Sequence, residues 1–249
     1  VNYIFSIYIH RYPRTTAWLK RMESLPDNET NEKGPILYVA LFSPPARACM
    51  ITAKIIGLDL DLKEHLSEEF MKLNPMHTVP VLVDEGEVIW DSHAIMNYMV
   101  SKYAKDDSLY PKDLVKRAHV DQRMHYENGI LFQVIRDFVN RIIHGGETEY
   151  SPKTIEQAHI SYGFLEKFLE GDFVVGNTMT IADISIHTSL ITLRKLVPIE
   201  PTRYPRITTW LKRMESLPNN LDVNEKGAEQ LYLRIKSVLA ENNAKAAST

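Results

Sequence analysis

The sequence of 249 residues predicts an α/β domain at about residues 35–108, followed by an all-helical domain at about 109–240. Three observations support this division. Short apolar segments with strand character alternate with helical segments up to residue 104. The segment KDDSLYPKD at 105–113 is polar and rich in turn-forming residues. After it, apolar residues recur with the helical period, and no convincing strand is found.

The first domain combines one crossover with one hairpin. Its predicted elements, in chain order, are a strand at 36–42, a helix at 46–56, a short helix at 68–74, a hairpin at 78–90 and a helix that starts at Asp91–Ser92 and runs to 104. Gly57 ends the first of these helices. A crossover followed by a hairpin and a closing helix is the plan of a thioredoxin-like domain.

The second domain contains only helices. We expect them at 112–143, 152–170, 179–196, 204–216 and 225–240, with breaks supplied by glycine and proline. Thr180 and Asp183 form a T-x-x-D pattern, which is typical of a helix-starting capping box, and we assign it to folding. Residues 241–249 carry nothing apolar to pack, so we expect them to fray.

Composition excludes several classes of function. The formal net charge is -3 and no Lys/Arg block occurs, which argues against nucleic acid or an anionic membrane as a partner. The single cysteine, Cys49, makes neither an internal disulfide nor a multi-cysteine metal site, so we expect no metal and a cytoplasmic location. The longest apolar run, residues 3–9, is far short of the roughly 20 residues of a membrane helix and lacks the flanks of a secretory signal.

One long repeat interrupts this ordinary composition. RYPRTTAWLKRMESLP at 11–26 recurs as RYPRITTWLKRMESLP at 203–218, with only two differences. Two copies so far apart do not build a solenoid, because stacked repeats must be contiguous. We interpret residues 1–34 as an extraneous extension that duplicates the C-terminal region of a tandem paralogue, and a genuine added helix is the alternative. In either case, the packing partners of this sequence are already occupied by the second copy.

Ser43 is the first candidate for chemistry. In Ser43-Pro44-Pro45-Ala46 it stands where a thioredoxin-like redox enzyme carries its cysteine pair, so disulfide exchange is excluded. What remains is a hydroxyl at a helix N-terminus, where backbone N–H groups and the helix dipole favour an anion. Such a hydroxyl can hold a thiolate supplied by a ligand. The alternative is that Ser43 only caps the helix.

Two further signals lie in the hairpin and the closing helix. Val79-Pro80 precedes a strand, which suggests a fixed and possibly cis turn that presents backbone groups to a peptide-like ligand. Asp91 and Ser92 at a helix start can bind the ammonium and carboxylate of an amino-acid headgroup, although an ordinary cap is equally consistent. Together with Ser43, these signals suit different parts of one peptide.

These segments resemble those of the insect cytosolic glutathione transferases, and most closely the epsilon and delta classes. The resemblance rests on LYVALFSPPARACMITAKIIGLDL, LNPMHTVPVLVDEGEVIWDSHAIMNYMVSKYAKDDSLYPKD and TMTIADIS, and it covers about residues 35–240. It implies a homodimer of two-domain subunits that uses glutathione as co-substrate. The implied reaction transfers glutathione to hydrophobic electrophiles in detoxification, with insecticide dehydrochlorination as one family activity.

The resemblance also assigns roles to individual positions. Ser43 resembles the catalytic serine, which donates a hydrogen bond to the glutathione sulfur and so lowers the pKa of the thiol. The implied glutathione-binding residues are His65, His77, Val79, Pro80, Asp91, Ser92 and His93. The residues implied to face the hydrophobic substrate are Phe42, Phe132, Arg136, Asn140 and His144, of which the last four recur every fourth residue on one helix.

One segment departs from the family pattern. Between Gly57 and Asn74 the chain is about seven residues short, so we expect little room for a second strand in the sheet. The same shortening puts the position of His65 in doubt and favours an alternative function, a non-catalytic protein that binds and sequesters hydrophobic ligands. Retention of Ser43 favours the enzyme. A third reading, an inactive product of fusion and deletion, predicts poor soluble expression.

Overall fold

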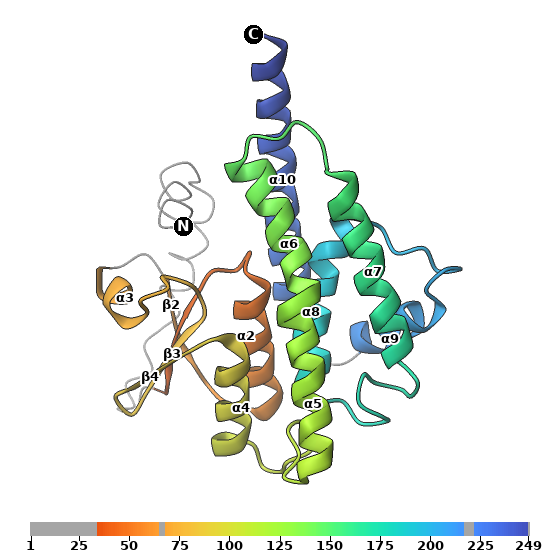
Figure 1. The fold of residues 1–249 in the computed structure, drawn as a ribbon. Helices are drawn as coiled ribbons and strands as arrows, with labels where there is room; N and C mark the ends of the chain where they lie inside the picture. Colours follow the sequence, from red (N-terminus) through yellow and green to blue (C-terminus); the bar gives the residue numbers. More distant parts are fainter. Residues whose placement is uncertain (1–33, 65–67, 217–221, 249) are drawn as a thin grey trace.

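The computed structural model describes residues 34–64, 68–216 and 222–248. In this part of the chain, a small sheet with its helices lies against a larger bundle of helices (Figure 1). The predicted α/β domain and the predicted helical domain are both present in this order. The predicted extension at 1–34 lies outside the described residues except for Gly34.

The sheet has four strands in the order β2-β1-β3-β4. They are β1 (Ile36–Val39), β2 (Asp61–Glu64), β3 (Val81–Asp84) and β4 (Glu87–Trp90). β2 is parallel to β1, while β3 is antiparallel to both β1 and β4. Leu37 and Leu82, which are paired in the register, have no exposed surface and start the core beneath the helices.

The expectation of little room for a second strand is wrong, because the sheet contains β2. β2 pairs with β1 over four residues, from Ile36 with Asp61 to Val39 with Glu64. A strand at the sheet edge needs only one partner, so four residues are enough to form it. Leu60 and Leu62 are partly buried and pack against the main core, which fixes the register of this short strand.

Three helices belong to the sheet domain: α2 (Pro44–Ile56), α3 (Glu68–Leu73) and α4 (Ser92–Tyr103). α2 begins two residues before its predicted start, because Pro44 and Pro45 occupy the first helical positions, where no N–H is needed. It ends as predicted at Gly57, whose φ of 74° is left-handed. α2 packs against α4 and also against α8 of the helical domain, so it is the central connection between the domains.

The remaining helices form the second domain. In chain order they are α5 (Leu114–Tyr126), η1 (Glu127–Leu131), α6 (Phe132–Phe138), η2 (Val139–His144), α7 (Pro152–Phe168), α8 (Ile181–Leu196), α9 (Pro205–Glu215) and α10 (Asp222–Ala247). The single helix predicted at 112–143 is therefore a continuous rod with two π-helical turns, η1 and η2. An apolar period close to that of an α-helix runs through both turns, so the sequence gives no sign of them.

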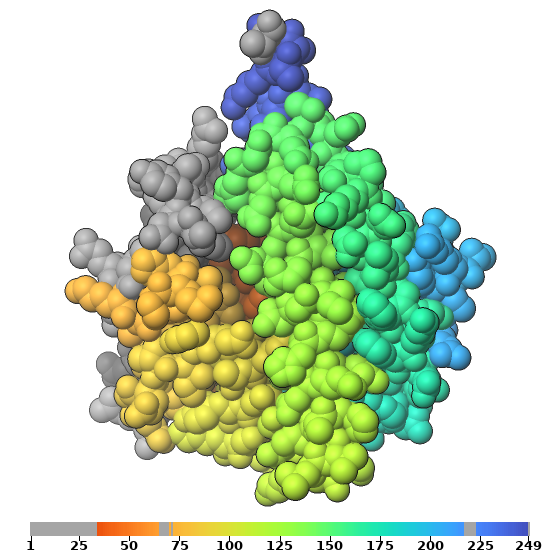
Figure 2. Space-filling model, in the orientation of Figure 1, coloured from red at the N-terminus to blue at the C-terminus, as the bar shows by residue number. Residues whose placement is uncertain are grey.

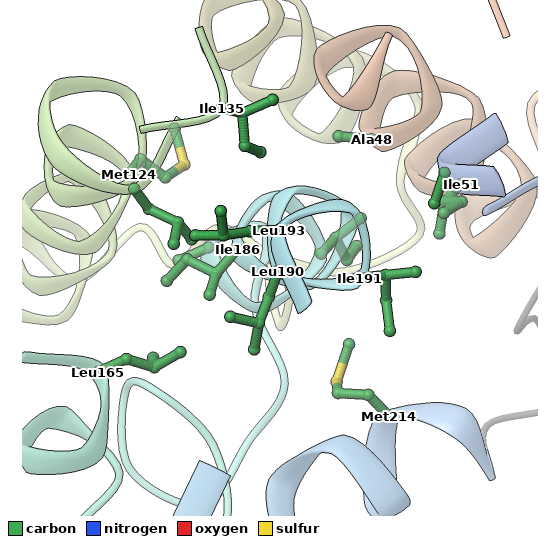
Figure 3. Close-up of a cluster of buried hydrophobic side chains, with 14 of the residues drawn as sticks. Ala48, Ile51, Met124, Ile135, Leu165, Ile186, Leu190, Ile191, Leu193 and Met214 are labelled. Atoms are coloured by element: carbon green, nitrogen blue, oxygen red, sulfur yellow. The ribbon is translucent and has the colours of Figure 1, made fainter. Parts of the chain in front are cut away.

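Helix α8 is the centre of the helical domain. All of its residues except Arg194 and Lys195 are buried. Figure 3 shows Ile186, Leu190, Ile191 and Leu193 of this helix surrounded by side chains of α2, α5, α6, α7 and α9. The predicted capping box starts the helix, since the Asp183 carboxylate accepts the Thr180 backbone N–H at 2.9 Å.

The C-terminal segment is more ordered than expected. Residues 241–247 continue α10 instead of fraying, and the helix projects from the body of the domain (Figure 1). The Asn242 amide donates to the carbonyls of Ile142 and Glu147, both at 2.9 Å. Polar contacts thus extend the helix where apolar contacts are missing. No described helix is long and apolar enough to cross a lipid bilayer.

Candidate active site

Three segments that carry candidate residues leave the sheet at the same edge. The antiparallel pairs Tyr38–Val81 and Val81–Trp90 show that β1 and β4 end where β3 begins. The segments that join the strands at this edge contain Ser43, Val79-Pro80 and Asp91-Ser92. The topology therefore brings together the three signals that the sequence predicts to serve one ligand. Figure 2 shows a hollow on this side of the molecule, with atoms coloured like β1 and α2 lying deeper than those of α6.

Ser43 is the N-cap of α2 and is half-buried. Its Oγ accepts the Ala46 N–H at 3.5 Å, a long cap bond that leaves the hydroxyl proton free to donate. Pro44 and Pro45 have no N–H, so the first turn of α2 offers few backbone donors. The Ser43 hydroxyl is thus the main hydrogen-bond donor that this helix start can offer to an anion. Capping and donation use different parts of the hydroxyl, so the two alternatives are compatible.

The turn before β3 is organised by Asn74, a residue that the sequence analysis missed. The Asn74 side chain is fully buried, donates to the Thr78 carbonyl at 2.9 Å and accepts the Met76 N–H at 2.9 Å. His77, within this turn, has a φ of 52°. The His77 Nδ1 atom is buried and has no hydrogen-bond partner among the described residues. The Val79-Pro80 bond is cis, as the sequence suggested.

Asp91 and Ser92 form the start of α4. Asp91 has a φ of 73°, and its Oδ1 atom accepts the His93 N–H at 2.9 Å, so it is the N-cap. The carboxylate is nevertheless exposed, which leaves its other oxygen accessible to a ligand. Ser92 is 8% exposed, and its carbonyl lies 3.6 Å from the Cys49 sulfur. This contact ties the start of α4 to the middle of α2.

The His93 ring points toward the helical domain. Its Nε2 atom lies 3.1 Å from a Glu127 carboxylate oxygen and 2.9 Å from the Ser185 hydroxyl. Glu127 is only 3% exposed, lies at the start of η1, and also accepts a hydrogen bond from Ser189. His93 therefore links the two domains through Nε2, in addition to any contact with a ligand. Glu127 is another residue that the sequence reasoning missed, since a glutamate in a mixed helix usually lies in solvent.

The candidates for the hydrophobic substrate come from the turn before Ser43 and from the helical domain. Phe42 and Phe132 are half-buried and pack against the main core. Arg136, on α6, and Asn140 and His144, on η2, are exposed. The structure thus places the four helical candidates on consecutive turns of one rod, with mixed apolar and polar character. His65 lies outside the described residues.

Cys49 is packed, as the sequence predicts. The side chain has no exposed surface, and burial, followed by the charge of Asp91, raises the pKa of its thiol well above the usual value. A thiol in this environment is a poor nucleophile. The described residues contain no group of three or more His, Cys, Asp or Glu side chains arranged to hold a metal ion.

Two family patterns match the chain. Residues 37–101 match the family described as "Glutathione S-transferase, N-terminal domain", and residues 124–218 match "Glutathione S-transferase, C-terminal domain". These ranges correspond to the sheet domain and to most of the helical domain. A thioredoxin-like sheet joined to an α8-centred helical domain is the architecture of this class.

Individual relatives agree with this assignment. Glutathione S-transferase 1 of Manduca sexta is 45% identical over 190 residues, which cover 73% of this chain and 88% of that protein. An epsilon-class glutathione S-transferase from the housefly, Musca domestica, has a TM-score of 0.79 at 46% identity and covers 82% of this chain and 98% of its own. A glutathione transferase homologue from Drosophila mojavensis, solved with bound glutathione, has a TM-score of 0.79 at 44% identity, over 83% and 98% of the two chains. The chain belongs to the glutathione S-transferase family.

Proposed function

We propose that this protein conjugates glutathione to hydrophobic electrophiles, with Ser43 activating the thiol. The observation that carries the proposal is the Ser43 hydroxyl at the start of α2, whose proton is free beside a helix end with few other donors. A hydrogen bond from this hydroxyl stabilises the thiolate relative to the thiol. One unit of pKa depression is worth about 1.4 kcal/mol and raises the thiolate fraction nearly tenfold near neutral pH.

The same edge of the sheet supplies contacts for the rest of the glutathione peptide. The half-buried His77 ring, in the turn before β3, is the proposed partner of the carboxylate at the glycyl end. The exposed carboxylate of Asp91, with Ser92 beside it, fits the γ-glutamyl headgroup, and the backbone of Val79 fits the cysteinyl unit. The homologue from Drosophila mojavensis, which was solved with bound glutathione, supports this ligand.

In the reaction, the glutathione thiol first loses its proton to solvent, and the resulting thiolate is held by Ser43. The sulfur then forms a bond to the electrophilic carbon, and for an aryl halide the carbon–halogen bond breaks and the halide leaves. Phe42 and Phe132 provide apolar surface for such a compound, and Arg136 provides a cation near it. Insecticide dehydrochlorination belongs to the same proposed range of substrates, because it also begins with a glutathione thiolate.

A homodimer is the proposed assembly. β4 is an edge strand, and its Val88 and Trp90 side chains are 37% and 40% exposed. Exposed apolar side chains along a sheet edge favour association with another chain. Light scattering coupled to gel filtration measures the mass directly. A monomer at micromolar concentration would contradict this assembly.

The proposed activity is tested by turnover of 1-chloro-2,4-dinitrobenzene with saturating glutathione. We expect the native protein to catalyse the reaction and Ser43→Ala to lose at least tenfold in kcat, because one hydrogen bond to the charged sulfur is removed. The variant should keep its melting temperature within a few degrees, since a half-buried hydroxyl at a cleft leaves no large cavity. Activity of Ser43→Ala within twofold of the native protein would refute the role of Ser43.

The non-catalytic alternative predicts a different result. A sequestering protein binds the hydrophobic compound without turnover and is indifferent to Ser43. The shortened segment between Gly57 and Asn74 was the observation in its favour, and β2 now accounts for four of those residues. Absence of turnover together with tight binding of a hydrophobic dye would favour this alternative.

A further inference from the structure

Ser43 is placed by a four-residue turn, Ala40–Ser43. The turn is closed by the Ser43 N–H, which donates to the Ala40 carbonyl at 2.9 Å. In such a turn, the peptide between the two central residues points in opposite directions in type I and type II. Here the carbonyl of this central peptide belongs to Leu41. Holding this one carbonyl therefore selects a single conformation of the turn that leads into Ser43.

The Leu41 carbonyl is held by Arg47, which lies one turn inside α2. Arg47 has no exposed surface, and its Nη1 atom donates to the Leu41 oxygen at 3.0 Å. The other hydrogen bonds of the guanidinium run from Nε to Asn224 Oδ1 at 2.9 Å, and from Nη2 to the Thr188 carbonyl at 3.1 Å and to Thr192 Oγ1 at 2.7 Å. One side chain thus joins the turn that carries Ser43 to α8 and α10.

Burial of the charged Arg47 side chain carries a large desolvation free energy. All four of its hydrogen-bond acceptors are neutral, so within the described residues no carboxylate bonds the guanidinium and compensates its charge. Burial lowers the pKa of Arg47 to about 9, opposed by the charge of Glu225, and the guanidinium remains protonated at neutral pH. An apolar side chain of similar size would fill this space without the desolvation cost of a cation. The arrangement is therefore explained better by orientation of the turn than by stability.

Asn224 has a defined orientation because Arg47 can only donate. Its Oδ1 atom faces Arg47, and its Nδ2 atom faces His187 Nδ1 at 3.3 Å. His187 therefore accepts at Nδ1, which agrees with a neutral ring, since burial lowers its pKa to about 3. Helix α10 also touches the turn directly: a Cβ on Gly227 would lie 2.1 Å from the Leu41 oxygen.

We propose that Arg47 is a positioning residue for the reaction: its bond to the Leu41 carbonyl, braced by Asn224 and the Gly227 segment of α10, fixes the turn that aims the Ser43 hydroxyl at the glutathione sulfur. The inference rests on the proposed function, because it assigns Arg47 a task only if Ser43 activates the thiol. The C-terminal helix of the substrate domain thereby contributes to thiol activation in the other domain.

The test is the pKa of the thiol of glutathione bound to the full chain, measured by ultraviolet absorbance of the thiolate as a function of pH. Arg47→Lys keeps a positive charge but lacks the planar fork that reaches four acceptors. We expect it to raise the bound thiol pKa by about one unit and to lower kcat about tenfold at pH 6.5. The KM for 1-chloro-2,4-dinitrobenzene should change less than twofold.

Gly227→Ala provides a second variant, one that keeps arginine at position 47. Alanine is normally favourable within a helix, but here its methyl group would lie 2.1 Å from the Leu41 oxygen and 2.7 and 2.9 Å from Arg47 Cδ and Nη1, so the bond between the carbonyl and the guanidinium is disturbed. We expect the same rise in thiol pKa from this change. Thr52→Ala is the matched control, because Thr52 is fully buried on the same helix and its hydroxyl donates to the Ala48 carbonyl of that helix at 2.9 Å. It should lower the melting temperature without moving the thiol pKa.

Ser43→Ala, measured in parallel, separates the two proposals. If Ser43→Ala leaves the bound thiol pKa unchanged, the proposed function fails. If Ser43→Ala raises it while Gly227→Ala leaves it at the native value, the role of Ser43 stands and the inference about the turn is overturned. If Arg47→Lys does not fold, the thiol pKa measured with Gly227→Ala decides whether the inference holds. An equal rise of the thiol pKa in Thr52→Ala would also overturn the inference.

Discussion

Two buried charged residues contact α8: Asp183 belongs to this helix, and Arg47 of α2 packs against it. The two residues differ in how far along the sequence their hydrogen-bond partners lie. Asp183, in the first turn, accepts hydrogen bonds from Thr180, from the Val174 N–H at 2.9 Å and from Trp210 Nε1 at 3.0 Å. Two of these partners lie within nine residues of it in the sequence. Arg47, against the middle of the same helix, bonds residues 141, 145 and 177 positions away.

The difference separates a folding element from a positioning element. The Asp183 cluster starts a helix and docks α9, and none of its members lies at the sheet edge that carries Ser43. The Arg47 cluster reaches the turn that contains Ser43 through the Leu41 carbonyl. Burial raises the pKa of Asp183 despite its hydrogen bonds, and it lowers the pKa of Arg47. Burial destabilises the charged form of both residues, but only Arg47 contacts the turn that carries the proposed catalytic serine.

The largest expected effect is on the Asp183 cluster. Asp183→Ala leaves the buried N–H groups of Val174, Thr180 and Trp210 without an acceptor, at about 1–3 kcal/mol each. We expect the melting temperature to fall by about 6–12 °C or more, since 1 kcal/mol corresponds to about 2–4 °C at this size. The thiol pKa of glutathione bound to the remaining folded protein should be unchanged. Asp106→Ala, which removes an exposed cap of the Ser108 N–H, is the control and should cost under about 2 °C.

The pH dependence of stability tests the Arg47 cluster through His187, which bonds the Asn224 amide. Burial, assisted by the charges of Arg194 and Arg47, lowers the pKa of His187 from 6.5 to about 3. Above pH about 6.5 the ring is neutral in both the folded and unfolded chain, so its stability contribution is complete. Below that pH only the unfolded chain takes up the proton, and the free energy of unfolding falls by about 1.4 kcal/mol per pH unit until about pH 3.

We therefore expect the native protein to lose about 2 kcal/mol more than His187→Gln between pH 7 and pH 5, measured by urea unfolding. The comparison of slopes removes any constant cost of the substitution. His119→Gln, an exposed histidine, should give the native slope. Equal slopes for the native protein and His187→Gln would show that the ring titrates normally in the folded state.

The smallest expected effect concerns the repeated sequence. The groove beside the Asp183 cluster is filled by α9, whose Ile207, Trp210, Leu211 and Met214 are buried. Among the described residues, this groove is therefore already filled by the second copy of the repeat. Deleting residues 1–33 should therefore leave the melting temperature within about 2 °C by calorimetry. A fall of more than about 4 °C would mean that the segment contributes roughly 1 kcal/mol or more of packing.

The distinction between local and distant hydrogen-bond partners also explains how much of the fold the sequence predicts. Local patterns predict the helix caps at Ser43, Asp91 and Thr180, the helix end at Gly57 and the hairpin at 78–90, because each depends on neighbours within a few residues. The π turns η1 and η2, the edge strand β2 and the continuation of α10 to Ala247 depend on contacts with distant segments. Asn242, for example, bonds carbonyls that lie 95 and 100 residues away.

The candidate site follows the same rule. Ser43, Val79-Pro80 and Asp91-Ser92 are recognisable because each carries a local signature, and the sheet topology then joins them. Glu127 and Arg47 act through buried polar contacts with distant segments, which have no local signature. Asn74 differs, because it bonds Met76 and Thr78 within one turn, and an asparagine two residues before the N–H that it accepts is a local turn signal that the sequence analysis did not use. Arg47 also offered a hint, since a charged residue in the otherwise apolar and small run PPARACMITA suggests burial with specific partners.

The central claim is that the Ser43 hydroxyl stabilises the glutathione thiolate, and its most direct test is titration of bound glutathione by thiolate absorbance. The native protein should give a thiol pKa at least one unit below the value of about 8.5 for an unperturbed cysteine thiol. Ser43→Ala, saturated with glutathione, should return the pKa to within about half a unit of the free value. Identical pKa values for bound glutathione in the two proteins would contradict the account.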